Sequence, residues 1–277
     1  MAKEIQLIVN ADDFGYWQCV SRGILHAANH GRITATSIMA NSTILDELAP
    51  ELLKVHSTIS VGVHLNLTSG YPLSKGMKQW QSSMVGRFPG KGDLLKLILT
   101  NKLSLELILE EYRQQIEECL SRGFNIEFLN SHEHIHMLPM VYEIVRKLSL
   151  EYGIKNIRWT RPDIIKVNFS SMFRSAALGV MGLLNKNKSN DREPIMLGLS
   201  QSGKLSLEGL VRIFNKLQPG NTYELMCHPG FFDKNEIIDE SLLGYHDWEG
   251  ELALLMSDEL MNLYTNNRIK LINYSSI

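Results

Sequence analysis

The sequence EIQLIVNADDFG (Glu4–Gly15) joins a short apolar segment to two consecutive aspartates, Asp12 and Asp13. A segment of this kind predicts a buried β-strand. Side chains that follow such a strand lie at the carboxyl edge of a parallel sheet, where α/β proteins place their sites. An acidic pair in isolation can also serve as a turn or a helix N-cap, so the rest of the chain has to decide between these interpretations.

The same pattern continues from one end of the chain to the other, because β-rich runs alternate with helical patterns. This alternation predicts an α/β fold built on a parallel sheet, and eight candidate strands are enough for a barrel. The expected strands are Glu4–Asn10, Ile33–Ala40, Ile59–Leu67, Ile126–Asn130, Asn156–Thr160, Ile195–Leu199, Thr222–His228 and Arg268–Asn273. Helices are expected at Gln18–His30, Leu105–Ser121 and Pro139–Tyr152, with Gly31 and Gly123 at two C-termini.

Length and composition indicate one globular unit. The chain has 277 residues, 44% of them hydrophobic and 21% charged, and no linker or repeat divides it, so we expect a single domain over residues 1–277. A net charge of -2 argues against a nucleic-acid partner or an anionic membrane partner. The sequence has no heptad run, which leaves a homodimer open.

The chain contains no apolar run long enough to cross a membrane, and charge interrupts its start before a signal-peptide core can form. We therefore expect a cytoplasmic protein. Cys19, Cys119 and Cys227 are odd in number and lack CxxC spacing, which predicts reduced core thiols. The polar stretches Thr68–Gly92 and Asn185–Gly203 are expected to be loops that cover a substrate or plain surface insertions.

Histidines follow several of the predicted strands. His64 lies in ISVGVHLNL, and His228 ends the run TYELMC. In SHEHIHMLP, three histidines stand at positions i, i+2 and i+4: His132, His134 and His136. On an extended chain all three would point the same way, and on a helix the first and last would.

Groups at the carboxyl ends of parallel strands meet over one pocket, even when they are far apart in the sequence. Two imidazoles and one carboxylate are a recurring set of ligands for a divalent cation. His64, His132 and either Asp12 or Asp13 can supply this set. A lone histidine is more often structural, but three within five positions favour a metal or substrate site.

Five motifs occur in an order that resembles the YdjC-like carbohydrate deacetylases, the family of chitooligosaccharide deacetylase. They are NADDFG (Asn10–Gly15), TATSIMAN (Thr34–Asn41), GVHLNLTSGYPL (Gly62–Leu73), SHEHIHMLP (Ser131–Pro139) and HPGFFD (His228–Asp233). The resemblance implies a distorted, TIM-like (β/α) barrel that removes acetyl groups from N-acetylated sugars with one divalent metal ion, Mg²⁺ or Zn²⁺.

The resemblance also implies roles for individual residues. Asp13, His64 and His132 match the metal ligands, and Asp12 matches the carboxylate that acts as base. His228 matches the histidine that acts as general acid in related polysaccharide deacetylases, although a histidine before Pro229 and Gly230 can also cap a turn.

One motif departs from the family pattern. Many members read RExEL before the last helix, whereas this chain reads WEGEL (Trp248–Leu252). Arg158 or Arg161 can replace the missing arginine as the residue that orients the catalytic carboxylate or the substrate, unless each forms a surface ion pair.

Other side chains around the predicted site are candidates for supporting roles. His134 and His136 can contact the ligands or the substrate, and Glu133 can orient an imidazole. Four aromatic residues can stack on a sugar ring or pack in the core: Tyr16, Trp17, Tyr71 and Trp159.

Two other functions compete with deacetylation. A metallophosphoesterase can use the same aspartate and histidine ligands, but it usually shows a second metal set or a phosphate-cradling glycine loop. A non-catalytic sugar-binding protein can hold a structural metal, but it has no need of an acid and a base such as His228 and Asp12.

Overall fold

A computed structural model describes residues 4–82, 86–160, 178–185 and 193–277. All eight predicted strands are present. Their bounds are β1 Ile5–Phe14, β2 Ala35–Ile38, β3 Ser60–Leu65, β4 Ile126–Ser131, β5 Asn156–Ile157, β6 Ile195–Leu197, β7 Thr222–Cys227 and β8 Ile269–Leu271. Most are shorter than predicted, whereas β1 runs four residues further and includes both aspartates.

The strands form one parallel sheet with the order β5-β4-β3-β2-β1-β7-β6. β7 pairs with one edge of β1 over Gln6–Ala11. The other edge of β1 is shared, because β8 pairs with Ile5–Leu7 and β2 pairs further along, from Asn10 onward. No described pairing joins β5 to β6, so the described strands form a curved, incomplete barrel. The predicted distorted barrel is confirmed.

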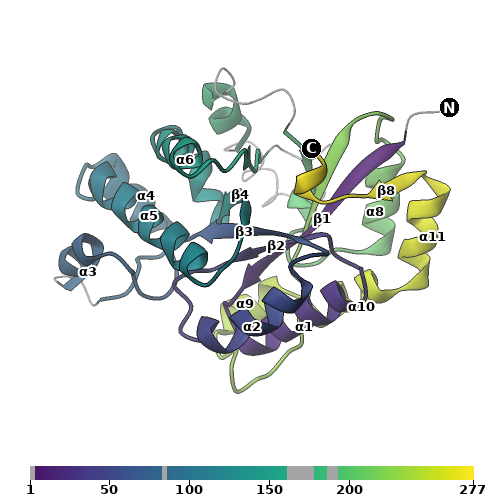
Figure 1. The fold of residues 1–277 in the computed structure, drawn as a ribbon, viewed down its shortest axis with the longest axis horizontal. Helices are drawn as coiled ribbons and strands as arrows, with labels where there is room; N and C mark the ends of the chain where they lie inside the picture. The colour runs from purple at the N-terminus through teal and green to yellow at the C-terminus, as the bar shows by residue number, and fades with distance from the viewer. Residues whose placement is uncertain (1–3, 83–85, 161–177, 186–192) are drawn as a thin grey trace.

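The helices lie around the outside of the curved sheet (Figure 1). Their bounds are α1 Gln18–Asn29, α2 Leu45–Val55, α3 Lys75–Ser82, α4 Lys91–Leu99, α5 Leu105–Ser121, α6 Pro139–Tyr152, α8 Leu207–Phe214, α9 Glu240–Tyr245, α10 Trp248–Met256 and α11 Asp258–Asn266. Short 3-10 helices follow β4 (η1, His132–Met137), β6 (η3, Leu199–Gln201) and β8 (η4, Tyr274–Ser276). The three predicted helices are therefore present, two of them with the predicted bounds.

The predicted loop Thr68–Gly92 is partly helical. It contains α3, which buries Met77 and Gln81 and packs on α5. The stretch is mostly polar and α3 buries only these two side chains, so the sequence lacks the apolar periodicity that predicts a helix. The other predicted loop, Asn185–Gly203, contains β6 and η3, and its residues 186–192 lie outside the described part of the chain.

One cluster of buried apolar side chains runs between the sheet and the helices, from Ile5 in β1 to Ile269 in β8. The three cysteines are free and buried, as predicted, and burial raises the pKa of the Cys19 thiol to about 11. Among the described residues, no helix is long and apolar enough to span a membrane. The single-domain organisation stays a prediction.

Candidate functional site

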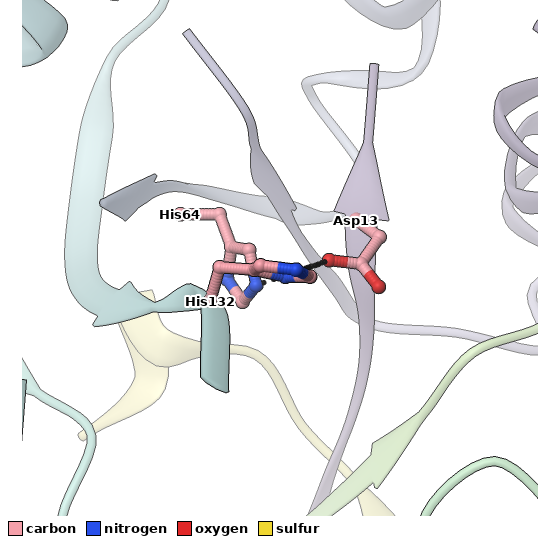
Figure 2. A group of neighbouring side chains, drawn as sticks. All are labelled: Asp13, His64 and His132. Atoms are coloured by element: carbon pink, nitrogen blue, oxygen red, sulfur yellow. Dashed lines mark hydrogen bonds and ion pairs between the residues drawn. The ribbon is translucent and has the colours of Figure 1, made fainter. Parts of the chain in front are cut away.

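Three strand ends bring Asp13, His64 and His132 together (Figure 2). Asp13 belongs to β1, His64 to β3, and His132 is the first residue after β4. His64 Nε2 lies 3.2 Å from Asp13 Oδ1, and His132 Nδ1 lies 2.9 Å from the same oxygen. One ligand atom from each residue lies within 4.8 Å of the others. The two imidazoles and the carboxylate therefore have the proximity that a metal site needs.

The backbone of Asp13 explains how two neighbouring aspartates can serve one site. Successive side chains of a regular strand point to opposite faces. At this point the register of β1 with β2 shifts, between Ala11 and Phe14, and Asp13 has a φ of 68°. Aspartate tolerates this left-handed conformation better than most residues. Asp12 and Asp13 consequently both line the same cavity.

The side chain of His64 has a defined orientation. Its Nδ1 lies 2.7 Å from Asn130 Oδ1, and Asn130 Nδ2 donates to Asp12 Oδ1 and to Ser37 Oγ. Because the amide nitrogen of Asn130 is committed elsewhere, its oxygen accepts a proton from His64 Nδ1. In the neutral ring this leaves the lone pair on Nε2, directed at Asp13.

Charge around Asp13 and His132 is complementary. Burial opposes ionisation of Asp13, but the charge and hydrogen bond of His132 outweigh burial and hold the pKa of Asp13 well below its usual value. Burial also opposes protonation of His132, and the charge of Asp13 outweighs it and raises the pKa of His132. Asp13 is thus ionised at neutral pH.

Asp12 is a buried carboxylate that is surrounded by donors. Its Oδ1 accepts hydrogen bonds from Asn10, Ser37, Asn130 and Arg158, at 2.7 to 3.0 Å. Its Oδ2 has one described donor, Arg158 Nη1, at 2.6 Å. Burial would raise the pKa of Asp12, but the charges of Arg158 and His64 outweigh burial and lower it well below the usual value. Asp12 is therefore ionised, and Oδ2, which accepts one described hydrogen bond, can accept another.

Arg158 joins Asp12 to a second buried carboxylate. Its Nε and Nη2 donate to Glu224 Oε1 at 2.8 and 2.6 Å, and all three side chains are almost fully buried. Of the two arginines proposed from the sequence, Arg158 makes the predicted contact with the carboxylate at the site. Arg161 lies outside the described residues. The surface ion pair is excluded for Arg158, because this side chain has no exposed area.

The histidines of the segment 131–139 do not share a direction, contrary to both predicted geometries. Glu133 and His134 have positive φ values of 54° and 59°, which turn the chain between the three imidazoles. His134 lines the cavity, with Nδ1 3.4 Å from Thr160 Oγ1. His136 is fully buried and pairs with Ser131 Oγ and with the carbonyl oxygen of Arg158. His136 therefore supports the Arg158 backbone.

His228 follows β7 and lines the same cavity as Asp12. Its backbone N–H donates to Glu251 Oε2 at 2.6 Å, so the second glutamate of WEGEL holds the backbone at His228 in place. Burial raises the pKa of Glu251. His228 Nδ1 is buried without a hydrogen-bond partner. Trp248, where the family pattern has arginine, packs against Trp17 with ring centroids 5.9 Å apart.

The cavity has a volume of about 690 Å³, and both aspartates, His64, His132 and His228 line it. Glu133 lines it too, but no described hydrogen bond joins this residue to an imidazole. The wall residues that sequence reasoning missed include Lys91, Tyr245 and His246. The polar and aromatic run GYHD, directly before WEGEL, was the available signal for Tyr245 and His246.

The predicted sugar-stacking aromatics lie elsewhere. Tyr16, Trp17 and Tyr71 line a second hollow of about 420 Å³, and Tyr16 also contacts the ring of His132 at 5.3 Å. Trp159 is buried against Tyr142. Core packing is therefore the role of Trp159.

Comparisons with known proteins identify relatives of the chain. The chain is 29% identical to a carbohydrate deacetylase of Clostridium beijerinckii, over 99% of this chain and 100% of the relative. It is 29% identical to a chitooligosaccharide deacetylase of Yersinia enterocolitica, over 82% and 83%. A crystal structure from Enterococcus faecalis, titled as a candidate cellobiose-phosphate cleavage protein, has the same fold, with a TM-score of 0.78 and 24% identity over 99% and 98% of the two chains. The model of the family described as YdjC-like protein matches residues 6–266, so the chain belongs to this family.

Proposed function

We propose that this protein is a hydrolase that removes acetyl groups from N-acetylated sugars with one divalent metal ion. The observation that carries the proposal is a carboxylate and two imidazoles, with ligand atoms within 4.8 Å of one another, on a cavity that also holds Asp12 and His228. The names of the relatives, carbohydrate deacetylase and chitooligosaccharide deacetylase, support a sugar substrate.

The donor set fits a cation. With its proton on Nδ1, His64 directs the lone pair of Nε2 at the ionised Asp13, 3.2 Å away. Two acceptors at this distance repel each other unless a proton or a cation lies between them. Asp13, His64 and His132 are therefore the proposed ligands. Two imidazoles and one carboxylate favour Zn²⁺ over Mg²⁺, which prefers oxygen ligands.

A divalent cation held by Asp13, His64 and His132 would lower the pKa of water and polarise the acetyl carbonyl. Asp12 is ionised and accepts the proton of the attacking water at Oδ2, while Arg158 holds its carboxylate in place. His228 donates a proton to the sugar nitrogen as the C–N bond breaks. The products are acetate and the free amino sugar, and no covalent intermediate is needed.

The test is acetate release from N-acetylglucosamine and N,N′-diacetylchitobiose, followed by mass spectrometry before and after removal of metal, with Zn²⁺ and Mg²⁺ added back separately. A phosphate monoester is included as an alternative substrate. We expect acetate release that depends on metal. Release of phosphate without acetate would favour a metallophosphoesterase, and sugar binding without either product would favour a binding protein.

Alanine substitution of each proposed ligand tests the metal site separately. Each of the variants Asp13→Ala, His64→Ala and His132→Ala is expected to lose most of its bound metal by elemental analysis. His30→Ala, which removes an exposed histidine of the same chain, is the matched control and should keep its metal. Full metal content and full activity in all three ligand variants would contradict the assignment.

A further inference from the structure

His246 is a second imidazole on the cavity wall beside His228, and the proposed chemistry gives it no task. It lies between α9 and α10 and lines the cavity. The ring centroids of His246 and His228 are 4.9 Å apart, although no hydrogen bond joins the two rings. His246 is therefore close to the position at which the proposed acid meets the leaving group.

The ring of His246 is held by aromatic packing. It stacks on Trp248 with centroids 4.9 Å apart and an interplanar angle of 19°. Tyr245 meets it edge-on at 4.7 Å. Trp248 is buried and packs in turn on Trp17. Aromatic contacts on several sides restrict rotation of the imidazole, so its orientation is set before any ligand arrives.

The two ring nitrogens of His246 have different surroundings. Nδ1 is buried without a partner. It lies close to Gly203, because a Cβ added to this glycine would be 3.1 Å from Nδ1. Nε2 has no described hydrogen bond either, and it is not among the buried atoms, so the cavity is where it can find a partner. Among buried backbone groups an unpaired N–H is rarer than an unpaired acceptor, and the same preference applied to the imidazole favours the tautomer with the proton on Nε2.

The ring is neutral at physiological pH. Burial, followed by the charge of His228, lowers the pKa of His246 to about 3. A neutral ring with its proton on Nε2 offers one donor to the cavity and does not compete with His228 as an acid. This donor matches an oxygen of a sugar ring or a sugar hydroxyl.

We propose that His246 determines substrate specificity by donating a hydrogen bond from Nε2 to an oxygen of the sugar that carries the acetyl group. The identity of the ligand as an N-acetylated sugar rests on the proposed function. The hydrogen bond itself concerns binding and does not require turnover.

The experiment compares the wild-type protein with His246→Phe and His246→Gln. Phenylalanine can keep the stack on Trp248 but has no donor, whereas the amide of glutamine can place a donor near Nε2. Calorimetric titration with N,N′-diacetylchitobiose should show binding about three- to tenfold weaker in His246→Phe, the usual effect of one neutral hydrogen bond. Binding by His246→Gln should be partly restored.

Monodeoxy derivatives of the same sugar identify the oxygen. The derivative that lacks the oxygen bonded by His246 should bind to the wild type more weakly than the parent sugar does. To His246→Phe, this derivative and the parent sugar should bind equally well. Where acetate is released, the loss should appear in KM, and the pH profile of kcat should be unchanged.

Three results would overturn the proposal: equal binding by the wild type and His246→Phe, a lower kcat with a shifted pH profile, or no binding of N,N′-diacetylchitobiose by the wild type. The proposed function fails on a different result. If the wild type binds the sugar but releases no acetate from any N-acetylated sugar, deacetylation is wrong while the His246 contact is still decided by the binding data.

Discussion

The buried group of Asp12, Arg158 and Glu224 offers a test of how the proposed base is held. Arg158→Met keeps much of the side-chain volume but removes the guanidinium between two carboxylates that are almost fully buried. Four hydrogen bonds, two to each carboxylate, are lost with it. Removing one partner of a buried ion pair usually costs about 3–5 kcal/mol, because it leaves an uncompensated charge.

The pH dependence of this loss gives the sharper measurement. In the wild type the lowered pKa of Asp12 means that its ionised form stabilises the fold above about pH 4, and that this contribution is lost as the pH falls through the lowered value. Without Arg158 the strongest effect that opposes burial is lost, so the pKa of Asp12 rises and its buried charge is more easily neutralised by a proton. The stability difference between wild type and Arg158→Met should therefore shrink as the pH falls from 7 to 4.5.

The assay is urea unfolding at both pH values, with a chelator present so that bound metal does not contribute. Glu224→Gln is the matched control, because it leaves Asp12 and Arg158 as a neutral pair and should cost less. A loss below about 1 kcal/mol in Arg158→Met at pH 7, well under the range expected for a buried pair, would refute the reasoning. So would a difference that is equal at both pH values.

Three further substitutions and one control variant test the site. Asp12→Asn should keep the metal and lose acetate release by a factor on the order of 10²–10⁴, because an amide cannot accept the water proton; a near wild-type rate would remove Asp12 as the base. His228→Ala should lose a similar factor on an N-acetyl sugar but much less on an acetyl ester with a good leaving group, and equal losses would argue against the acid role. Gly23→Ala would place a Cβ 2.4 Å from Gly230 Cα, so we expect a loss of about 1–3 kcal/mol in stability and a lower kcat, since this contact positions the loop after His228. Gly244→Ala, which meets no atom within 4 Å, should unfold at the wild-type temperature.

The sequence predicted the meeting of distant residues better than it predicted their orientation. Alternating strands and helices place His64 and His132 at the same edge of a sheet, whatever the details of packing. The orientation of each side chain depends on backbone conformations that no pattern specified. The prediction that His132 and His136 point the same way is wrong, because Glu133 and His134 both adopt left-handed conformations.

Partners that meet only through tertiary structure were harder to predict. Arg158 was one of two candidates, and its link to Glu224 has no local signal, since β5 and β7 lie on opposite sides of β1 in the sheet. His246 was missed because it belongs to a connection between two helices rather than to a strand end. Its nearness to His228 depends on how Trp248 packs against Trp17.

Asp12 and Asp13 carry the same functional group, and their surroundings give them different chemistry. Asp12 is surrounded by neutral and cationic donors, so its charge is compensated without a metal. Among the described side chains, the polar atoms beside the Asp13 carboxylate are imidazole nitrogens of His64 and His132. If it were turned toward Arg158 as Asp12 is, His64 Nε2 and His132 Nδ1 would lose the oxygen that lies 3.2 and 2.9 Å from them. The left-handed backbone at Asp13 therefore separates a carboxylate available to a cation from one that is held by protein donors.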